Sequence, residues 1–162
     1  MNIFQPLTLC IALLGATPLH AQGTSVAFGT ITQDTTAPVE VTSDELSVDQ
    51  ETGRAVFVGN VIVGQGELRL AAQEVTVIYR EESAGIERMI ATGDVTLVSG
   101  LDAAEAKRAD YTIDSGEIIM TGDVLLTQGL SAIASDKMVI YLKDGTANMT
   151  GRVKTILQTG NN

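Results

Sequence analysis

Carboxylates are the only plentiful reactive side chains in this sequence, which holds 20 Asp and Glu residues but a single Cys and a single His. Two carboxylates could act as acid and base in a polysaccharide hydrolase. However, Asp94 and Asp123 each follow a glycine that recurs along the chain, whereas a catalytic pair is expected to interrupt a repeat. No Asp-x-Asp-x-Asp-Gly run is present, and Gly64-Gln65-Gly66 lacks the third glycine of a dinucleotide site. The residues therefore predict no enzyme, no metal and no cofactor, with a converging carboxylate pair as the alternative.

The first 21 residues have the pattern of a secretory signal peptide. The stretch from Leu7 to Ala16 carries no charge and is too short for a membrane span of about 20 residues, and Ala21 offers a cleavage point before Gln22. A buried amino-terminal helix or strand is the alternative. Export would remove both Cys10 and His20, so the mature chain could form no disulfide, no Cys or His metal site and no nucleophile–His pair.

Composition favours one compact globular domain. The chain has 162 residues, is 44% hydrophobic and 19% charged, and carries a formal net charge of -10. This is too apolar for a disordered acidic tail and too charged for a membrane bundle. All basic residues lie beyond position 50 and none forms a run, so nothing could neutralise a row of phosphates. We therefore expect no nucleic-acid partner.

Two short landmarks recur four times along the chain. The first places a polar residue and Val after a glycine: Gly59-Asn60-Val61, Gly93-Asp94-Val95, Gly122-Asp123-Val124 and Gly151-Arg152-Val153. The second is a small residue followed by two polar residues and an alternating strand, and it begins at Ser43, Ala72, Ala106 and Ser135. The second unit is longer than the others, and its extra residues fall in the charged turn 80–85, where an insertion costs little. The chain therefore holds four copies of one unit.

Apolar residues alternate with a period of two within each unit, which is typical of strands with one buried face. Short turns ending in Gly53, Gly116 and Gly145 separate these strands, so we expect a mainly antiparallel sheet built from hairpins. The repeated glycine falls at an inward position and predicts a bulge where a long strand turns from one sheet to the next. A similar kink is expected between Ala72 and Val75. The pattern predicts an all-β fold without helices, either a twisted two-sheet jelly roll or a solenoid.

The inward side chains are aliphatic and rich in methionine, with few aromatic rings. They either close an ordinary core or line a slot between two splayed sheets that accepts alkyl chains. Composition does not decide between the two. The candidate inner-face residues are Phe57, Val61, Val63, Met89, Val95, Leu97, Ile118, Met120, Val124, Leu126, Met138 and Met149, and the alternation extends the same face to Ala147, Val153 and Leu157.

The units resemble the OstA-like (LptA) domain family of periplasmic lipopolysaccharide transport proteins. The resemblance begins with Val41-Thr42-Ser43-Asp44-Glu45-Leu46, continues with Ala55-Val56-Phe57-Val58-Gly59-Asn60-Val61, and returns in Met120-Thr121-Gly122-Asp123-Val124 and Ala134-Ser135-Asp136-Lys137-Met138. It covers residues 39–158. We therefore expect a signal peptide at 1–21, a flexible leader at 22–38, the OstA-like domain at 39–158 and a tail at 159–162.

This resemblance implies a twisted β-jelly roll of repeated antiparallel hairpins, shaped as a V, that binds the lipid A acyl chains of lipopolysaccharide between its sheets. It also implies head-to-tail self-association and a bridge from an LptC-like inner-membrane partner to an LptD-like outer-membrane partner. Pairing would use edge strands at Val39 and Val41 and at Val153, Thr155 and Leu157, since exposed edges accept further strands. Arg152 and Lys154 would guard the second edge or contact lipid phosphates. A periplasmic structural scaffold without lipid cargo is the alternative function.

Overall fold

A computed structural model describes residues 24–28, 34–81 and 85–157, so the expected signal peptide and the tail at 159–162 lie outside the described residues. Every regular element in the described part is a β-strand, and it contains no helix that could cross a membrane. The strands are β1 (Thr24–Ala27), β2 (Glu40–Thr42), β3 (Glu45–Asp49), β4 (Arg54–Gln65), β5 (Leu68–Tyr79), β6 (Ile86–Ser99), β7 (Asp102–Thr112), β8 (Glu117–Gln128), β9 (Ser131–Tyr141), β10 (Thr146–Thr150) and β11 (Lys154–Ile156).

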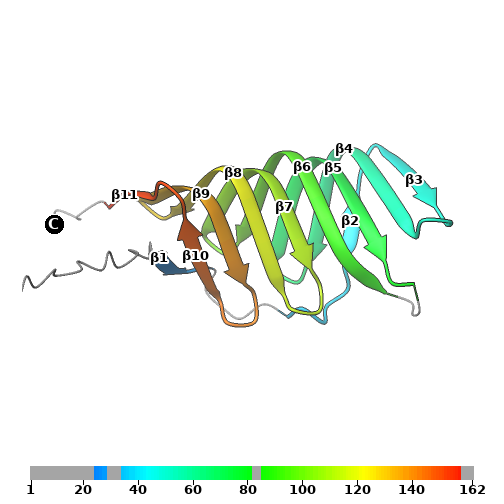
Figure 1. Cartoon of the computed structure of the whole chain (residues 1–162), viewed down its shortest axis with the longest axis horizontal. Helices are drawn as coiled ribbons and strands as arrows, with labels where there is room; N and C mark the ends of the chain where they lie inside the picture. The colour runs from blue at the N-terminus through cyan, green and yellow to red at the C-terminus, as the bar shows by residue number, and fades with distance from the viewer. Residues whose placement is uncertain (1–23, 29–33, 82–84, 158–162) are drawn as a thin grey trace, which may run out of the picture.

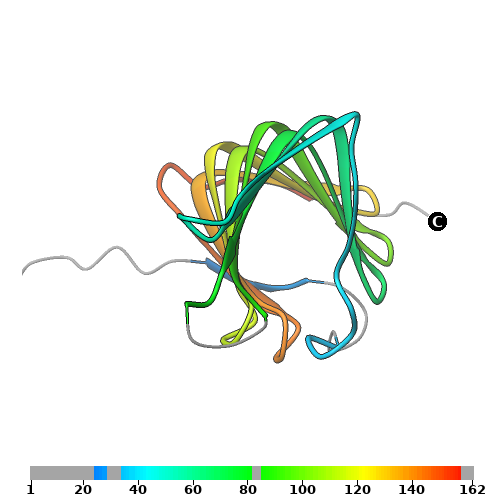
Figure 2. The ribbon, with the colours of Figure 1, turned by 90° about the vertical axis from the view of Figure 1, so that its right-hand side faces the viewer.

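All eleven strands belong to one antiparallel sheet, in which β4 to β9 follow one another in chain order along the long axis of the molecule (Figure 1). Each of these six long strands bends in the middle, so the sheet has two halves. The first half-sheet begins with β3 and ends with β10 and β1, and the second begins with β2 and ends with β11. Seen along the long axis, the halves diverge from a ridge of bends (Figure 2). The predicted antiparallel jelly roll is confirmed, with two halves of a continuous sheet in place of two separate sheets.

A repeated glycine marks the bends of β4, β6 and β8 and the turn from β10 into β11. Gly59, Gly93, Gly122 and Gly151 have φ between +78° and +84°, and the polar residue after each also has positive φ. The strand register shifts at the same places, for example between Thr92 and Val95 against β7, as a β-bulge requires. The predicted corner is therefore confirmed. The space that a glycine Cβ would fill faces the outer ridge and not the interior, so that part of the prediction is wrong.

The two repeated landmarks meet at this ridge. The polar residue after each small residue contacts the polar residue after the glycine on the next strand. Asn60 Nδ2 donates a hydrogen bond of 2.8 Å to Asp44 Oδ2, and Gln73 Nε2 donates one of 2.9 Å to Asp94 Oδ2. The next two pairs, Lys107–Asp123 and Arg152–Asp136, are ion pairs. The repeat therefore encodes one corner contact, used four times.

Part of the expected leader is structured. Thr24–Ala27 forms β1 and pairs with β10 from Thr24 opposite Met149 to Ala27 opposite Thr146. Phe28 is buried in the core, and its backbone N–H donates to Gly145 O at 3.0 Å. Residues 24–28, which were expected to belong to a flexible leader, therefore pair with the sheet. β1 has only four residues, which is too short a stretch for alternation to predict a strand from the sequence. Hydrogen bonding to β10 stabilises it instead.

Candidate functional site

The inward side chains form cross-strand rows that run the length of the sheet. One row in the first half-sheet joins Phe57, Val75, Ala91, Ala109, Met120, Met138 and Met149. A row in the second half-sheet joins Val63, Leu70, Leu97, Ala104, Leu126 and Ile133. We call the apolar space between the two half-sheets the slot. All predicted inner-face residues lie on it except Val153 and Leu157, and apart from the partly buried Phe57 none of the twelve candidates is more than 6% exposed.

The slot is narrow. A cavity of about 20 Å³, which is space for roughly one water molecule, lies between the halves. Its wall includes Val63 and Leu70 from the second half-sheet and Met89 and Ile118 from the first. Methionine side chains are flexible, and methionine and aliphatic side chains need no hydrogen-bond partners. Alkyl chains could therefore replace the contacts that these side chains make with one another across the slot without leaving a polar group unpaired.

A polar cluster that includes Gln65 and Tyr111 forms part of the wall of this cavity. The buried Tyr111 hydroxyl donates to Gln65 Oε1 at 2.6 Å, and Gln65 Nε2 donates to the carbonyls of Thr35 and Ala37, each at 3.0 Å. Burial raises the pKa of Tyr111 to about 12, and the hydrogen bond to Gln65 partly opposes that shift. Gln65 therefore has its amide satisfied by the tyrosine and by the segment at residues 34–38.

A second glutamine holds the amino-terminal segment in the same way. Gln128 ends β8 as Gln65 ends β4, each six residues after a repeated glycine, and its Nε2 donates to the Ala27 carbonyl at 2.8 Å. These contacts bring residues 24–28 and 34–38 across the side of the slot opposite the ridge (Figure 2). Sequence analysis missed this role. The shared distance from the glycine is the signal in the sequence, but it does not reveal the carbonyl partner.

The two ends of the slot differ. At the β3 end, Leu46 and Val48 pair with Phe57 and Ala55 and so share their inward side, yet they are 56% and 59% exposed. At the other end, Met149 lies beneath β1 and is fully buried. The slot is therefore open at the end formed by β3 and closed at the end formed by β1.

The predicted partner edges are placed as follows. Val41 lies in β2, Val39 precedes it, and both pack partly against the core. Thr155 is the central residue of β11, whereas Val153 and Leu157 flank that strand. Val153 is 37% exposed and Leu157 70% exposed, so the prediction that they continue the inner face is wrong. The alternation ends there because β11 is only three residues long and leaves the sheet after Ile156.

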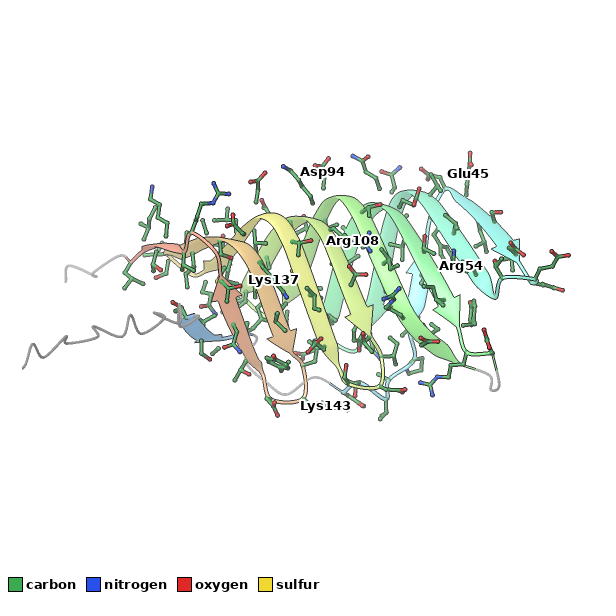
Figure 3. The ribbon with its side chains drawn as sticks, in the orientation of Figure 1. Glu45, Arg54, Asp94, Arg108, Lys137 and Lys143 are labelled. Carbon is green, nitrogen blue, oxygen red and sulfur yellow. The ribbon has the colours of Figure 1, made fainter. Side chains whose placement is uncertain are left out.

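The two ends of the sheet expose different charged side chains. The β2–β3 end carries exposed carboxylates, including Glu40 and Glu45, whereas the β11 end carries exposed Arg152 and Lys154. Charged side chains such as Glu45, Asp94 and Lys137 project outward from the ribbon (Figure 3). The charges therefore stay out of the slot, and the β11 end also carries Asp136, which is ion-paired with Arg152.

The ridge carboxylates are engaged in structural contacts. A hydrogen bond from Arg152, aided by its charge, lowers the pKa of Asp136, and the same kind of contact from Lys107 lowers the pKa of Asp123. Both pairs are exposed. Among the described residues, no group of three or more His, Cys, Asp or Glu side chains is arranged to hold a metal ion.

A bent antiparallel sheet around an apolar slot, with charged strand edges at its ends, defines an OstA-like jelly roll. The chain belongs to the family described as LptA/(LptD N-terminal domain) LPS transport protein, whose profile matches residues 40–146 and 105–159. The crystal structure of LptH from Pseudomonas aeruginosa, described as the LptA homologous periplasmic component of the lipopolysaccharide transport device, has the same fold. It superposes with a TM-score of 0.70 at 18% identity, covering 78% of this chain and 99% of LptH.

Two proteins with similar sequences align with this chain over different lengths. An uncharacterized protein of Rhizobium meliloti (strain 1021) is 29% identical over 122 residues, which are 68% of this chain and 66% of that protein. The lipopolysaccharide export system protein LptA of Escherichia coli (strain K12) is 40% identical over 47 residues, which are 29% of this chain and 25% of LptA. The aligned part of the chain thus spans less than two thirds of either relative.

Proposed function

We propose that this protein carries lipopolysaccharide through the periplasm, with the lipid A acyl chains lying in the slot. The observation that supports this most directly is the pair of unbroken apolar rows between the half-sheets, which contain no charged side chain. Family membership supports lipopolysaccharide as the cargo. The cavity is small because the protein's own side chains meet in it, so cargo must separate the half-sheets as it enters.

The energy scale favours a covered route. Each methylene that leaves an apolar environment costs about 0.8 kcal/mol, so exposing one chain of about 12 carbons costs on the order of 10 kcal/mol. A slot that continues from one molecule to the next avoids this cost. The open end at Leu46 and Val48 supports such continuity, since it presents inward apolar side chains to whatever docks there.

The bridge would form by head-to-tail association between copies and with LptC-like and LptD-like partners at the two membranes. An exposed strand edge can extend its sheet onto another chain by backbone hydrogen bonding. β2 and β11 are the two ends of the second half-sheet, and they run in opposite directions relative to the intervening strands. A second copy that continued these rows would pair β2 antiparallel to β11 with Val41 opposite Thr155, which places Glu40 diagonally across from Lys154 on the same face. Export by a signal peptide at residues 1–21 would place the chain in the periplasm.

Site-specific photo-crosslinking tests the cargo. A photoreactive residue at Val61, Leu126 or Met149 should capture lipopolysaccharide in cells, because all three side chains face the slot. The matched control is Thr96, which lies on the outer face between Val95 and Leu97. Capture only from Thr96 would refute the slot as the binding site. Normal lipopolysaccharide export after depletion, with no acyl chain on the purified protein, would instead support a structural scaffold.

A further inference from the structure

β1 extends the first half-sheet by one strand beyond β10. Without β1, each half-sheet contains eight strands: the first runs from β3 through β4–β9 to β10, and the second from β2 through β4–β9 to β11. Both halves would then end level with each other. β1 adds one strand to the first half alone and covers the β10 edge.

β1 takes the direction and row positions of β3. β1 runs antiparallel to β10, and β3 runs antiparallel to β4. Because β4 and β10 run in the same direction in the sheet, β1 and β3 also share one direction. Thr24 lies opposite Met149 in the row that starts with Leu46 opposite Phe57. Val26 lies opposite Ala147 in the row that starts with Val48 opposite Ala55.

The short sequences also correspond. Thr24-Ser25-Val26 in β1 takes the row positions that Leu46-Ser47-Val48 takes in β3. β3 of a second copy, added to β10 in the direction that continues the sheet, would lie where β1 lies now. It would bring two exposed apolar side chains onto the Met149 and Ala147 rows.

We propose that β1 is an internal substitute for β3 of a second copy, and that head-to-tail docking requires β1 to leave the β10 edge. This rests on the self-association in the proposed function and adds the strand exchange that controls it. Phe28 would leave the core with β1, because it follows directly and its N–H bonds to Gly145 beside β10. The closed end of the slot would thereby open toward the open end of the next copy.

A reversible disulfide tests this exchange. Ser25 and Asn148 are opposite each other on β1 and β10, beside the inward Ala147 and Met149, and directly paired strand residues lie close enough for a disulfide. We would measure self-association of Ser25→Cys/Asn148→Cys by sedimentation velocity, in a Cys10→Ser background. The control is Thr121→Cys/Lys137→Cys, which joins the facing residues of β8 and β9 and leaves both ends free. Thiol titration would establish that each pair is closed.

We expect the oxidised β1–β10 variant to associate at least about ten-fold more weakly than its reduced form, and the oxidised control to be unchanged. Equal association of the oxidised and reduced β1–β10 variant would overturn the inference. Two variants without a disulfide give independent readings. Phe28→Ala should strengthen association at least about ten-fold by loosening the cap, and Thr24→Leu should weaken it by making β1 more like β3.

Failure of this inference is distinguishable from failure of the proposed function. If every variant, including Phe28→Ala, stays monomeric while crosslinkers in the slot still capture lipopolysaccharide, a second copy is not the occupant of the β10 edge, and the cargo assignment stands. If association follows the cap as expected but no lipid is captured, the exchange is supported and the cargo assignment is wrong.

Discussion

Replacing Gly122 with alanine tests the corner on which the slot depends. Gly122 has φ +84°, and a Cβ built there would lie 2.9 Å from the Cβ of Lys107 on the neighbouring strand. A left-handed conformation costs alanine roughly 1–2 kcal/mol, and relieving an overpacked contact costs roughly 1–3 kcal/mol more. The contact cannot be relieved by rotating Lys107, because its Cβ is fixed to the backbone. We therefore expect Gly122→Ala to lower the free energy of unfolding by about 3 kcal/mol.

Gly129 provides the matched control. It lies in the turn between β8 and β9 with φ +57°, and a Cβ there would meet nothing within 4 Å. Gly129→Ala should therefore cost only the conformational part, about 1 kcal/mol. Urea unfolding at equilibrium would measure both variants, with the denaturant dependence compared to that of the wild type. Equal destabilisation by the two substitutions would refute the reasoning that close approach of Lys107 requires the corner glycine.

Three further predictions concern charge and hydrogen bonding. Burial raises the pKa of Tyr111 from 10.0 to about 12, so the contribution of its protonated hydroxyl to the free energy of unfolding is present below pH 10 and lost toward pH 12. Urea unfolding of the wild type between these pH values should show a loss of stability on the order of 2 kcal/mol that Tyr111→Phe lacks. The hydrogen bond from Arg152 lowers the pKa of Asp136, so its contribution is present above pH 3.8 and lost as acid protonates the carboxylate; acid titration of Arg152→Ala should lack this component, and identical acid profiles would contradict it. Glu40→Lys should weaken self-association in sedimentation velocity, and adding Lys154→Glu should restore it if the β2 and β11 edges meet.

Much of the fold could be predicted because the repeat has a direct physical meaning. A period of two identifies an inward face, and a recurring glycine within such a strand identifies a bulge. The alternation holds from β4 to β10, where each strand is flanked by others with the same pattern, and the recurring glycine marks a bulge in β4, β6 and β8. The prediction fails after Met149, because β11 has no further repeat beside it to keep Val153 and Leu157 inward.

Contacts between distant segments could not be predicted in this way. Gln65 binds carbonyls about 30 residues away, and a backbone carbonyl carries no mark in the sequence. Asp94 and Asp123 illustrate a different difficulty: their repetition correctly indicated a structural role, but not their positive φ or their partners Gln73 and Lys107. Asp tolerates the left-handed conformation better than most residues, which explains why it can follow the corner glycine.

The comparison of β1 with β3 suggests why a sheet that can grow does not grow without limit. A cap must bind its own edge well enough to prevent random pairing, yet less well than the correct partner strand. β1 has four residues and places Thr24 and Val26 on the inner rows, whereas β3 has five and would place Leu46 and Val48 there. The exchange of Thr for Leu buries more apolar surface and releases two exposed side chains from water. β1 is connected to the β10 edge within one chain, so β3 of a second copy would displace it only where the local concentration of copies is high enough.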